Sequence, residues 1–192
     1  MLLRRVVALC GLCFCLASAV PIAHALAGDD GARTTVSVSR SGPVFKVEAL
    51  SRVDADLATT WAVLTDYDGY KDFVPGMTLS RRVSDRPLLI EQRGEFGLLF
   101  FTKRVDALLE VVESPPSNLS FRSLQGNLRR LETFINIRRD GDQVLVDYRS
   151  VIEPDFWVPP LIGTPIVRAA IRRKLDAVAG EIERRARSAA SR

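Results

Sequence analysis

Six stretches of strand-like sequence follow one another between residues 77 and 153, and each ends in turn-forming residues. The turns carry Asp-Arg-Pro, single glycines, Pro-Pro-Ser, Gly-Asn and Asp-Gly, residue types that reverse the backbone sharply. Consecutive strands joined by such short turns pair antiparallel, so this half of the chain is predicted to form an antiparallel meander. The predicted strands cover residues 77–84, 87–96, 98–113, 118–125, 128–139 and 142–153.

A hairpin and a short helix are predicted ahead of this meander. Alternating apolar and polar residues on either side of the Ser-Gly-Pro turn at 41–43 predict a hairpin over residues 35–51. Leu57, Trp61 and Leu64 then recur at helical spacing, with either of the aspartates at positions 54 and 56 as the capping residue. We expect Trp61 to pack into the core.

A long amphipathic helix is predicted to close the chain. Thr164 can cap it, and Pro165 suits the first helical position because the missing N–H has no partner there. Burying its five aliphatic side chains is worth on the order of 10 kcal/mol before entropic costs, so the helix must lie on the sheet. The apolar face comprises Val167, Ile171, Leu175, Val178 and Ile182, at spacings of four, four, three and four residues.

Together these elements predict an α+β fold. A curved antiparallel sheet of about seven strands wraps on the long C-terminal helix, with two short helices after the first strand. A twisted sheet of this width curls, and a single helix cannot fill its trough, so we expect an apolar cavity between them. Side-chain parity directs Ile135, Tyr148 and Ser150 into this cavity from the strands, and Ile171 and Leu175 face it from the helix.

Residues 1–27 are predicted to be a secretory signal peptide. Arg4 and Arg5 give a positive start, residues 6–20 are apolar but short for a membrane span, and an Ala-Leu-Ala cleavage site ends at Ala27. An earlier Ala-Ser-Ala site and retention as a membrane anchor are the alternatives. Cleavage after Ala27 would leave a periplasmic or secreted protein.

The remaining chain suits one domain with a sizeable core. We expect an N-terminal lead with an extra strand at residues 28–43, the folded domain at 44–187, and a polar tail at 188–192.

Removal of the signal segment also removes most reactive side-chain chemistry. All three cysteines and the only histidine lie within it. The exported chain then has no thiol or imidazole, which excludes disulfides, cysteine nucleophiles, Ser-His-Asp triads and zinc sites built on these ligands. Because the segment holds two arginines and no acid, the formal charge falls from +4 to +2, too balanced to indicate a nucleic-acid partner. We expect no metal and no cofactor.

The segment TDYDGYKDFVPG at residues 65–76 combines three aspartates with several aromatic residues. An EF-hand calcium loop would need a glycine at its sixth position and a glutamate at its twelfth, and counting from the first aspartate gives lysine and methionine. We expect the aspartates at 66 and 68 to cap a second small helix instead. Two interpretations of Tyr67, Tyr70 and Phe73 are open: they cover the open end of the cavity, or they fill the core beneath the preceding helix.

An apolar run at residues 156–162 connects the last strand to the last helix. It is either a packed crossover or the lip of a portal that touches lipid, with Trp157 as its most prominent side chain. Arginines at 168, 172 and 173 follow closely and could meet anionic head groups.

Three segments of the chain resemble a known superfamily. The helix and turn "WAVLTDYDGYKDFVPGM", the strands "SLQGNLRRLETFINI" and "VDYRSVIEPDFWVPPLIG", and the terminal amphipathic helix are similar to the START-related polyketide cyclase/dehydrase and lipid transport superfamily (SRPBCC), nearest its coenzyme Q-binding branch. The resemblance covers residues 44–187. It implies a helix-grip fold with a hydrophobic tunnel that holds lipids, isoprenoid quinones or aromatic polyketides.

Two classes of function remain open. The first is noncatalytic binding or transport of a hydrophobic ligand, for which we expect transient contact with a membrane surface. The second is an aromatase/cyclase-like enzyme whose acid and base groups are tyrosines or carboxylates. Without a histidine or an isolated acidic motif, the residues favour the binder. The expected cavity and portal residues are Tyr67, Tyr70, Phe73, Ile135, Tyr148, Ser150, Trp157, Ile171 and Leu175.

Overall fold

The computed structural model describes residues 33–98 and 101–191. The predicted signal peptide, residues 1–27, and the beginning of the N-terminal lead lie outside the described residues. The strands are β1 (Thr34–Ser41), β2 (Val44–Val53), β3 (Met77–Asp85), β4 (Leu88–Leu98), β5 (Phe101–Ser114), β6 (Asn118–Gly126), β7 (Leu128–Asp140) and β8 (Gln143–Pro154). The helices are α1 (Leu57–Leu64), the 3₁₀ helix η1 (Tyr67–Gly69), α2 (Tyr70–Phe73) and α3 (Gly163–Ala190).

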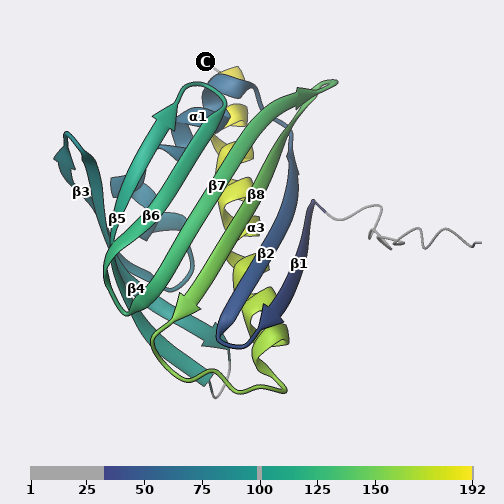
Figure 1. Cartoon of the computed structure of the whole chain (residues 1–192). Coiled ribbons are helices and arrows are strands. Elements are labelled where there is room, and N and C mark those ends of the chain that lie inside the picture. Colours follow the sequence, from purple (N-terminus) through teal and green to yellow (C-terminus); the bar gives the residue numbers. More distant parts are fainter. Residues whose placement is uncertain (1–32, 99–100, 192) are drawn as a thin grey trace, which may run out of the picture.

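All eight strands form one antiparallel, curved sheet in the order β1-β2-β8-β7-β6-β5-β4-β3 (Figure 1). The predicted meander is confirmed, and every strand boundary lies within three residues of the expected one. The sheet has one strand more than the about seven expected, because β1 from the N-terminal lead joins it. The β1–β2 hairpin is also confirmed, and β2 pairs with β8, which places the start of the domain beside its last strand.

Helix α3 crosses the concave face of the sheet (Figure 1). Its expected apolar face is confirmed, since Val167, Ile171 and Ile182 are buried. The start differs from the prediction: the helix begins at Gly163, and no side chain caps it, so Thr164 is not the cap. Residues 188–190, assigned to a polar tail, continue the helix to Ala190. At this end Arg33 Nη2 pairs with Glu183 Oε2 at 2.9 Å and links the start of β1 to the helix.

Helix α1 begins as predicted from the second of the two candidate caps. The Asp56 side chain accepts a hydrogen bond from the Thr59 backbone N–H at 2.6 Å, which satisfies one free donor of the first turn. Trp61 is partly buried against the main core, in agreement with its predicted core role. Of the described helices, none is long and apolar enough to cross a membrane.

The core has two clusters of buried side chains. The larger lies under α1 and the C-terminal half of α3, around Tyr67, Ile90, Leu119 and Ile182. The smaller lies between the β1–β2 hairpin and the N-terminal half of α3, around Phe45, Val47, Val158 and Val167. Tyr148 of β8 packs partly against both clusters, so it marks the region where they meet.

Gly126 ends β6 in a backbone conformation that a side chain would not fit. Its φ is +117°, and a Cβ atom there would overlap the carbonyl oxygen of Asp106 on the neighbouring strand. Gly141, in the β7–β8 turn, also has a positive φ of +63°, but a Cβ atom there would meet nothing within 4 Å. Both glycines therefore have a backbone conformation that disfavours other residues, but only Gly126 also lacks the space for a side chain.

Candidate ligand cavity

A cavity of about 260 Å³ lies between the concave face of the sheet and α3. Its wall is overwhelmingly apolar and takes residues from most strands, from the segment that follows β8, and from one face of α3. The expected cavity between sheet and terminal helix is therefore present. Its volume lies just below the range of roughly 300–1000 Å³ that is usual for small-molecule sites. The larger apolar lining residues include Leu64, Phe96, Leu109, Phe121, Leu131, Ile135, Val146, Ile152, Phe156, Ile171, Leu175, Val178 and Ile182.

Few polar side chains reach this wall. Tyr148 is one of them, and burial raises the pKa of its hydroxyl, an effect that the neighbouring hydroxyls of Ser150 and Thr133 partly offset. Tyr148 is therefore neutral at physiological pH and can donate a hydrogen bond to an oxygen atom inside the cavity. Thr133 also lines the cavity, and its Oγ1 atom is 2.8 Å from Ser150 Oγ.

Two basic residues also line the cavity, and they differ in their partners. Arg93 pairs with Glu91 at 2.6 Å and lies 3.7 Å from a carboxylate oxygen of Asp106, so its charge is balanced on the outer side of β4. Lys174 of α3 makes no ion pair or hydrogen bond within residues 33–98 and 101–191. No aspartate or glutamate of the described chain contributes to the lining.

The aromatic residues of the 65–76 segment divide between the two interpretations. Tyr67 is fully buried in the larger core cluster, and its hydroxyl donates to Glu113 Oε1 at 2.7 Å, so it fills the core and lies outside the cavity lining. Burial, reinforced by Glu113, raises the pKa of Tyr67. Tyr70 does line the cavity, but its hydroxyl already donates to the Leu64 carbonyl at 2.7 Å.

Phe73 lies outside the cavity lining, where its ring packs against that of Tyr70. The two rings meet edge-on with centroids 5.5 Å apart, and the Arg185 guanidinium lies 5.8 Å from the Phe73 ring centroid. The segment therefore closes one end of the cavity with the ring of Tyr70, while its other two aromatic residues build the surrounding core.

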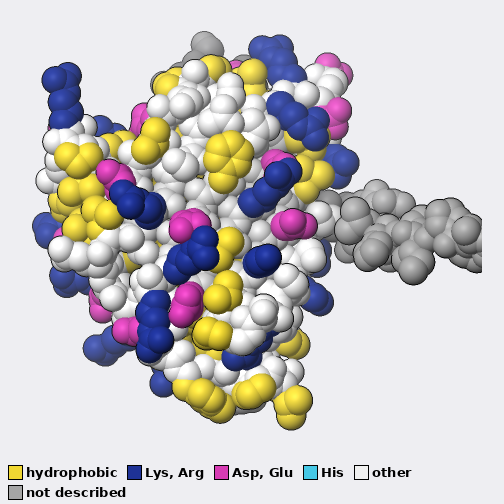
Figure 2. All heavy atoms as spheres, in the orientation of Figure 1, with side chains coloured by type: hydrophobic (Ala, Val, Ile, Leu, Met, Phe, Trp, Pro, Cys, Tyr) yellow, Lys and Arg dark blue, Asp and Glu magenta, His cyan; other side chains and the backbone are white. Residues whose placement is uncertain are grey.

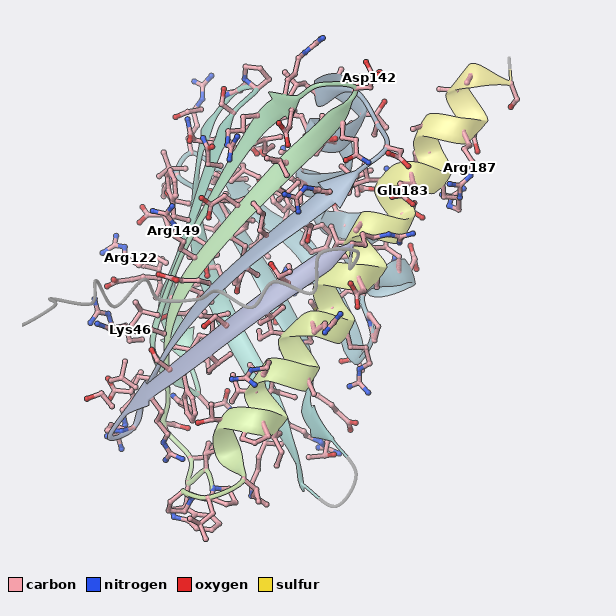
Figure 3. All side chains as sticks on the ribbon, turned by 90° about the vertical axis from the view of Figure 1, so that its right-hand side faces the viewer. Lys46, Arg122, Asp142, Arg149, Glu183 and Arg187 are labelled. Atoms are coloured by element: carbon pink, nitrogen blue, oxygen red, sulfur yellow. The ribbon has the colours of Figure 1, made fainter. Side chains whose placement is uncertain are left out.

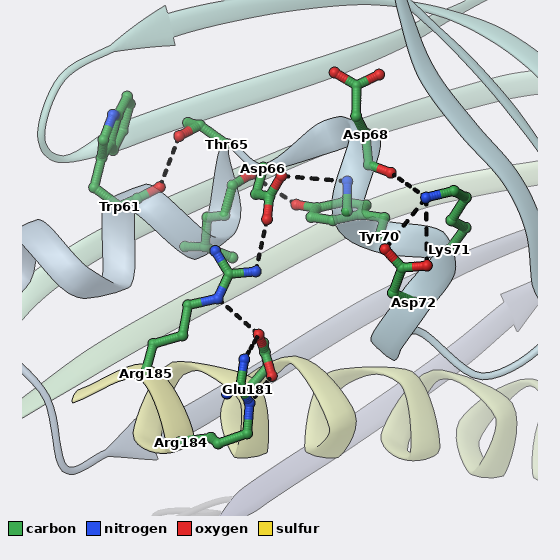
Figure 4. Close-up of polar contacts among 12 residues, drawn as sticks. Trp61, Thr65, Asp66, Asp68, Tyr70, Lys71, Asp72, Glu181, Arg184 and Arg185 are labelled. Carbon is green, nitrogen blue, oxygen red and sulfur yellow. Dashed lines mark hydrogen bonds and ion pairs between the residues drawn. The ribbon is translucent and has the colours of Figure 1, made fainter. Parts of the chain in front are cut away.

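The carboxylates of the three aspartates in this segment have different partners. Figure 4 shows those of Asp66 and Asp72, and it shows Lys71 donating to the backbone carbonyl of Asp68. Asp66 caps η1 by accepting from the Gly69 N–H, as predicted, and also accepts from Arg185 Nη2 at 2.6 Å. The prediction that Asp68 caps a helix is wrong, because its carboxylate accepts from the Arg82 backbone N–H of β3 at 2.9 Å.

Asp72 pairs with the adjacent Lys71 on the surface. The carboxylates thus point to different partners, and the described residues contain no cluster of three or more ligands that could hold a metal ion.

Arg185 and its neighbours fasten the last turns of α3 to this segment. Glu181 Oε1 accepts from Arg184 Nη2 and from Arg185 Nε, both at 2.7 Å, while Arg185 reaches Asp66 (Figure 4). Hydrogen bonds from Arg184, and then from Arg185, lower the pKa of Glu181 to about 2. The network fixes the C-terminal half of the helix over the closed end of the cavity.

The segment between β8 and α3 turns alternate side chains in and out. Phe156 and Val158 line the cavity, whereas Trp157 is 70% exposed and lies outside the lining. Leu161 and Ile162 are also exposed, so three large apolar side chains form an outward-facing group that we call the lip. Figure 2 shows hydrophobic side chains gathered at the lower edge of the molecule, where this segment lies in Figure 1.

Arg40 of β1 holds the backbone beneath the lip. Its guanidinium donates to the carbonyl of Pro159 at 3.0 Å and to that of Val158 at 3.1 Å, and it lies 4.8 Å from the ring centroid of Phe45. Of the arginines expected nearby, Arg173 donates to the Gly97 carbonyl at 3.3 Å, which places the end of β4 beside the helix.

Of the nine predicted cavity and portal residues, the structure brings five together around the cavity. These are Tyr70, Ile135, Tyr148, Ile171 and Leu175. Ser150 is buried beside them, but its hydroxyl is engaged with Thr133 and it is not part of the lining. Tyr67 and Phe73 belong to the core around the closed end, and Trp157 to the outer surface.

Sequence reasoning missed Lys174, which lines the cavity and makes no ion pair with the described residues. It lies three residues after Ile171 and four before Val178, so helical spacing already places it on the apolar face. The apolar pattern was complete without it, and a lysine is normally assigned to the solvated side.

A curved antiparallel sheet closed by a C-terminal helix over an apolar cavity defines the START-like, helix-grip class of proteins. The chain belongs to the polyketide cyclase/dehydrase and lipid transport family, whose model matches residues 53–179. Comparison with curated proteins gives no significant match.

Solved structures from several bacteria share the fold. A STAR-related lipid transfer protein from Xanthomonas axonopodis is 14% identical, with a TM-score of 0.60 over 78% of this chain and 93% of that chain. The Zhui aromatase/cyclase from Streptomyces sp. R1128 is 17% identical, with a TM-score of 0.58 over 76% and 98%. A START superfamily protein from Mycobacterium smegmatis is 19% identical, with a TM-score of 0.57 over 74% and 97%. At sequence identities this low, the similarity shows a shared fold only.

Proposed function

We propose that the protein binds and carries a hydrophobic small molecule without converting it chemically. The observation that carries this proposal is the cavity between the sheet and α3, whose wall is apolar except for a few side chains. Burial of ligand hydrocarbon in such a space supplies binding free energy of roughly 25 cal/mol per Å² of apolar surface. A lipid, an isoprenoid quinone or a similar molecule has the required chemistry, and the resemblance to the coenzyme Q-binding branch supports the quinone within that class.

The polar groups of the cavity support binding over catalysis. Tyr148 is neutral at physiological pH, so it can orient a ligand oxygen but is a poor base. The Tyr70 hydroxyl is already used by the Leu64 carbonyl. The carboxylates of the 65–76 segment are engaged outside the lining, with the Arg82 N–H and with Arg185 among their partners.

An aromatase/cyclase-like activity is the second candidate. The likeness in fold to the Zhui aromatase/cyclase favours it, and Tyr148 is the side chain best placed to act as an acid. Turnover of a polyketide-like substrate that is lost in Tyr148→Phe would favour the enzyme over the carrier.

We further propose that the lip touches a membrane surface while ligand enters or leaves. The lip side chains Trp157, Leu161 and Ile162 are exposed, and the neighbouring lining residues Phe156 and Val158 connect them to the cavity. Arg168 is exposed on the first turns of α3, close enough in sequence to meet anionic head groups. Binding to lipid vesicles measures this contact.

Export to the periplasm or beyond the cell is also proposed, from the positive start, apolar run and cleavage site in residues 1–27. N-terminal sequencing of protein recovered from the periplasmic fraction tests it, and a mature start at Gly28 is expected. An intact Met1 in membrane-bound protein would favour the anchor.

Native mass spectrometry of the purified protein, followed by lipid extraction, tests the carrier proposal. We expect co-purified hydrophobic molecules, or uptake of quinone or phospholipid by the empty protein. Ala107→Phe should reduce uptake by filling the cavity, because Ala107 is a buried lining residue. Ala189→Phe, on the exposed end of α3, is the matched control. Protein that is recovered empty and takes up neither these lipids nor a single-chain amphiphile would refute the proposal.

A further inference from the structure

Lys174 lies within an apolar surface where none of the described residues offers its ammonium group a counter-ion. The lining residues Ile171, Leu175 and Val178 surround it on α3, and its Nζ atom lies 5.8 Å from the ring centroid of Phe96 across the cavity wall. A desolvated cation over an aromatic face gains roughly 2 kcal/mol, but the ring carries no negative charge to neutralise the ammonium group. That contact does not replace an ion pair.

The charged groups nearest Lys174 do not neutralise its positive charge. Its helix neighbour Arg173 is a second cation, directed to the Gly97 carbonyl, and the other lining cation, Arg93, already pairs with Glu91. Burial, and then Arg173, lower the pKa of Lys174, which means that its surroundings disfavour the charged form. An unpaired lysine in an apolar wall destabilises the empty protein, and an anion from the ligand would relieve this.

We propose that Lys174 binds the anionic end of the ligand, and that the ligand is a single-chain amphiphile ending in a carboxylate or a phosphate. A volume of about 260 Å³ favours one hydrocarbon chain over two. The apolar wall continues from Lys174 along α3 to Ile182, about 12 Å at 1.5 Å per residue, which gives the chain its path. The inference rests on the proposed carrier function and narrows its ligand class.

A displacement assay with a neutral reporter separates this inference from the carrier function. N-phenyl-1-naphthylamine, an uncharged hydrophobic fluorophore, is bound first and then displaced by dodecanoate, dodecyl phosphate or dodecanol. The two anions are used below their micellar concentrations, and dodecanol is used below its solubility limit. A charge-assisted hydrogen bond predicts that at least one anion displaces the reporter from the wild-type protein at a roughly 10-fold to 100-fold lower concentration than dodecanol. The preferred anion distinguishes a carboxylate ligand from a phosphate ligand.

Lys174→Met should abolish this preference, because the anions lose their charged partner whereas dodecanol has no charge to pair. Lys174→Gln is the second variant, should the methionine protein fail to fold, and thermal unfolding checks both. Lys46→Met is the matched control, because it removes the same charge from the opposite face of the sheet, where Figure 3 shows Lys46 pointing away from α3.

Each outcome has a separate meaning. Equal displacement by the anions and the alcohol in the wild-type protein would overturn the role of Lys174 and leave the carrier proposal standing. A preference for anions that persists in the folded Lys174 variants would overturn that role as well. Failure of the wild-type protein to bind the reporter and every competitor would instead count against the carrier function itself.

Discussion

Replacing the three exposed lip residues tests whether this edge of the molecule enters a membrane. The variant is Trp157→Ser, Leu161→Ser and Ile162→Ser in one chain. These side chains are 70%, 93% and 39% exposed, so the folded protein loses little packing when they are shortened. A lipid membrane could bury the exposed surface of these three side chains.

The size of the effect follows from these exposed fractions. Complete burial of a large apolar side chain is worth about 2 kcal/mol, so transferring the exposed parts of the three into lipid gains about 4 kcal/mol. At about 1.4 kcal/mol per factor of ten, the variant should bind vesicles roughly 1000-fold more weakly than the wild-type protein. Partial insertion would lower this value in proportion.

Flotation with vesicles of neutral lipid, and of neutral lipid mixed with anionic lipid, measures the partition coefficient. We expect tighter binding to the anionic vesicles, because each basic residue near the surface contributes about 1 kcal/mol there. The control is a second triple variant, Val83→Ser, Val112→Ser and Phe134→Ser, which removes side chains that are 44%, 59% and 45% exposed elsewhere on the surface. It should bind as the wild-type protein does.

Two results would refute this reasoning. Vesicle binding that is equal for the wild-type protein and the lip variant would mean that the lip stays in water. Equal losses in the lip variant and the control variant would mean that general surface hydrophobicity, and not this edge, causes binding. Thermal unfolding of all three proteins excludes a trivial loss through misfolding.

Three further predictions concern stability. Gly126→Ala should lower the free energy of unfolding by several kcal/mol, and Gly141→Ala by about 1–2 kcal/mol. Both positions have a positive φ, but only at Gly126 would the added Cβ atom also collide with the backbone. Urea unfolding compares the two variants, and equal losses of stability would refute the collision. Arg40→Met should cost about 2 kcal/mol by removing two charged donors from the carbonyls under the lip, and an unchanged urea midpoint would contradict this. Because the pKa of Glu181 is lowered from 4.5 to about 2, its stabilising contribution is complete above pH 4.5 and is lost as the pH falls toward 2. Glu181→Gln should flatten the dependence of stability on pH in that window, and an unchanged acid titration would argue against the network.

The regular elements could be predicted because their signals are local. Proline, glycine and asparagine mark most strand ends, and the alternation between them fixes which side chains face the helix. The same parity correctly brought Ile135 and Tyr148 to the cavity. It also brought Ser150 to the buried side of the sheet, but parity says nothing of hydrogen bonds, and Thr133 on the neighbouring strand engages that hydroxyl.

The errors arose where a distant segment decides the outcome. Asp68 looks like a cap in its own segment, yet its partner is the Arg82 N–H, fourteen residues later in β3. The segment between β8 and α3 has no regular period, so the sequence could not show that Phe156 faces the cavity and Trp157 faces outward. Helical spacing did carry the information about Lys174, but the expectation that lysine is solvated concealed it.

The cavity itself follows from a mismatch in width. Eight strands about 4.8 Å apart span roughly 34 Å, whereas one helix with its side chains is only about 10–12 Å across. Large side chains fill the trough at its two ends, Tyr67 and Ile182 in one cluster and Phe45 and Val167 in the other. Between the clusters lies Tyr148, which packs partly against both, and the space beside it stays open. Helix α3 reaches both clusters, so neither end of the helix can move inward to close that space without separating a packed core. The two cores that stabilise the fold are therefore also what keeps the cavity open.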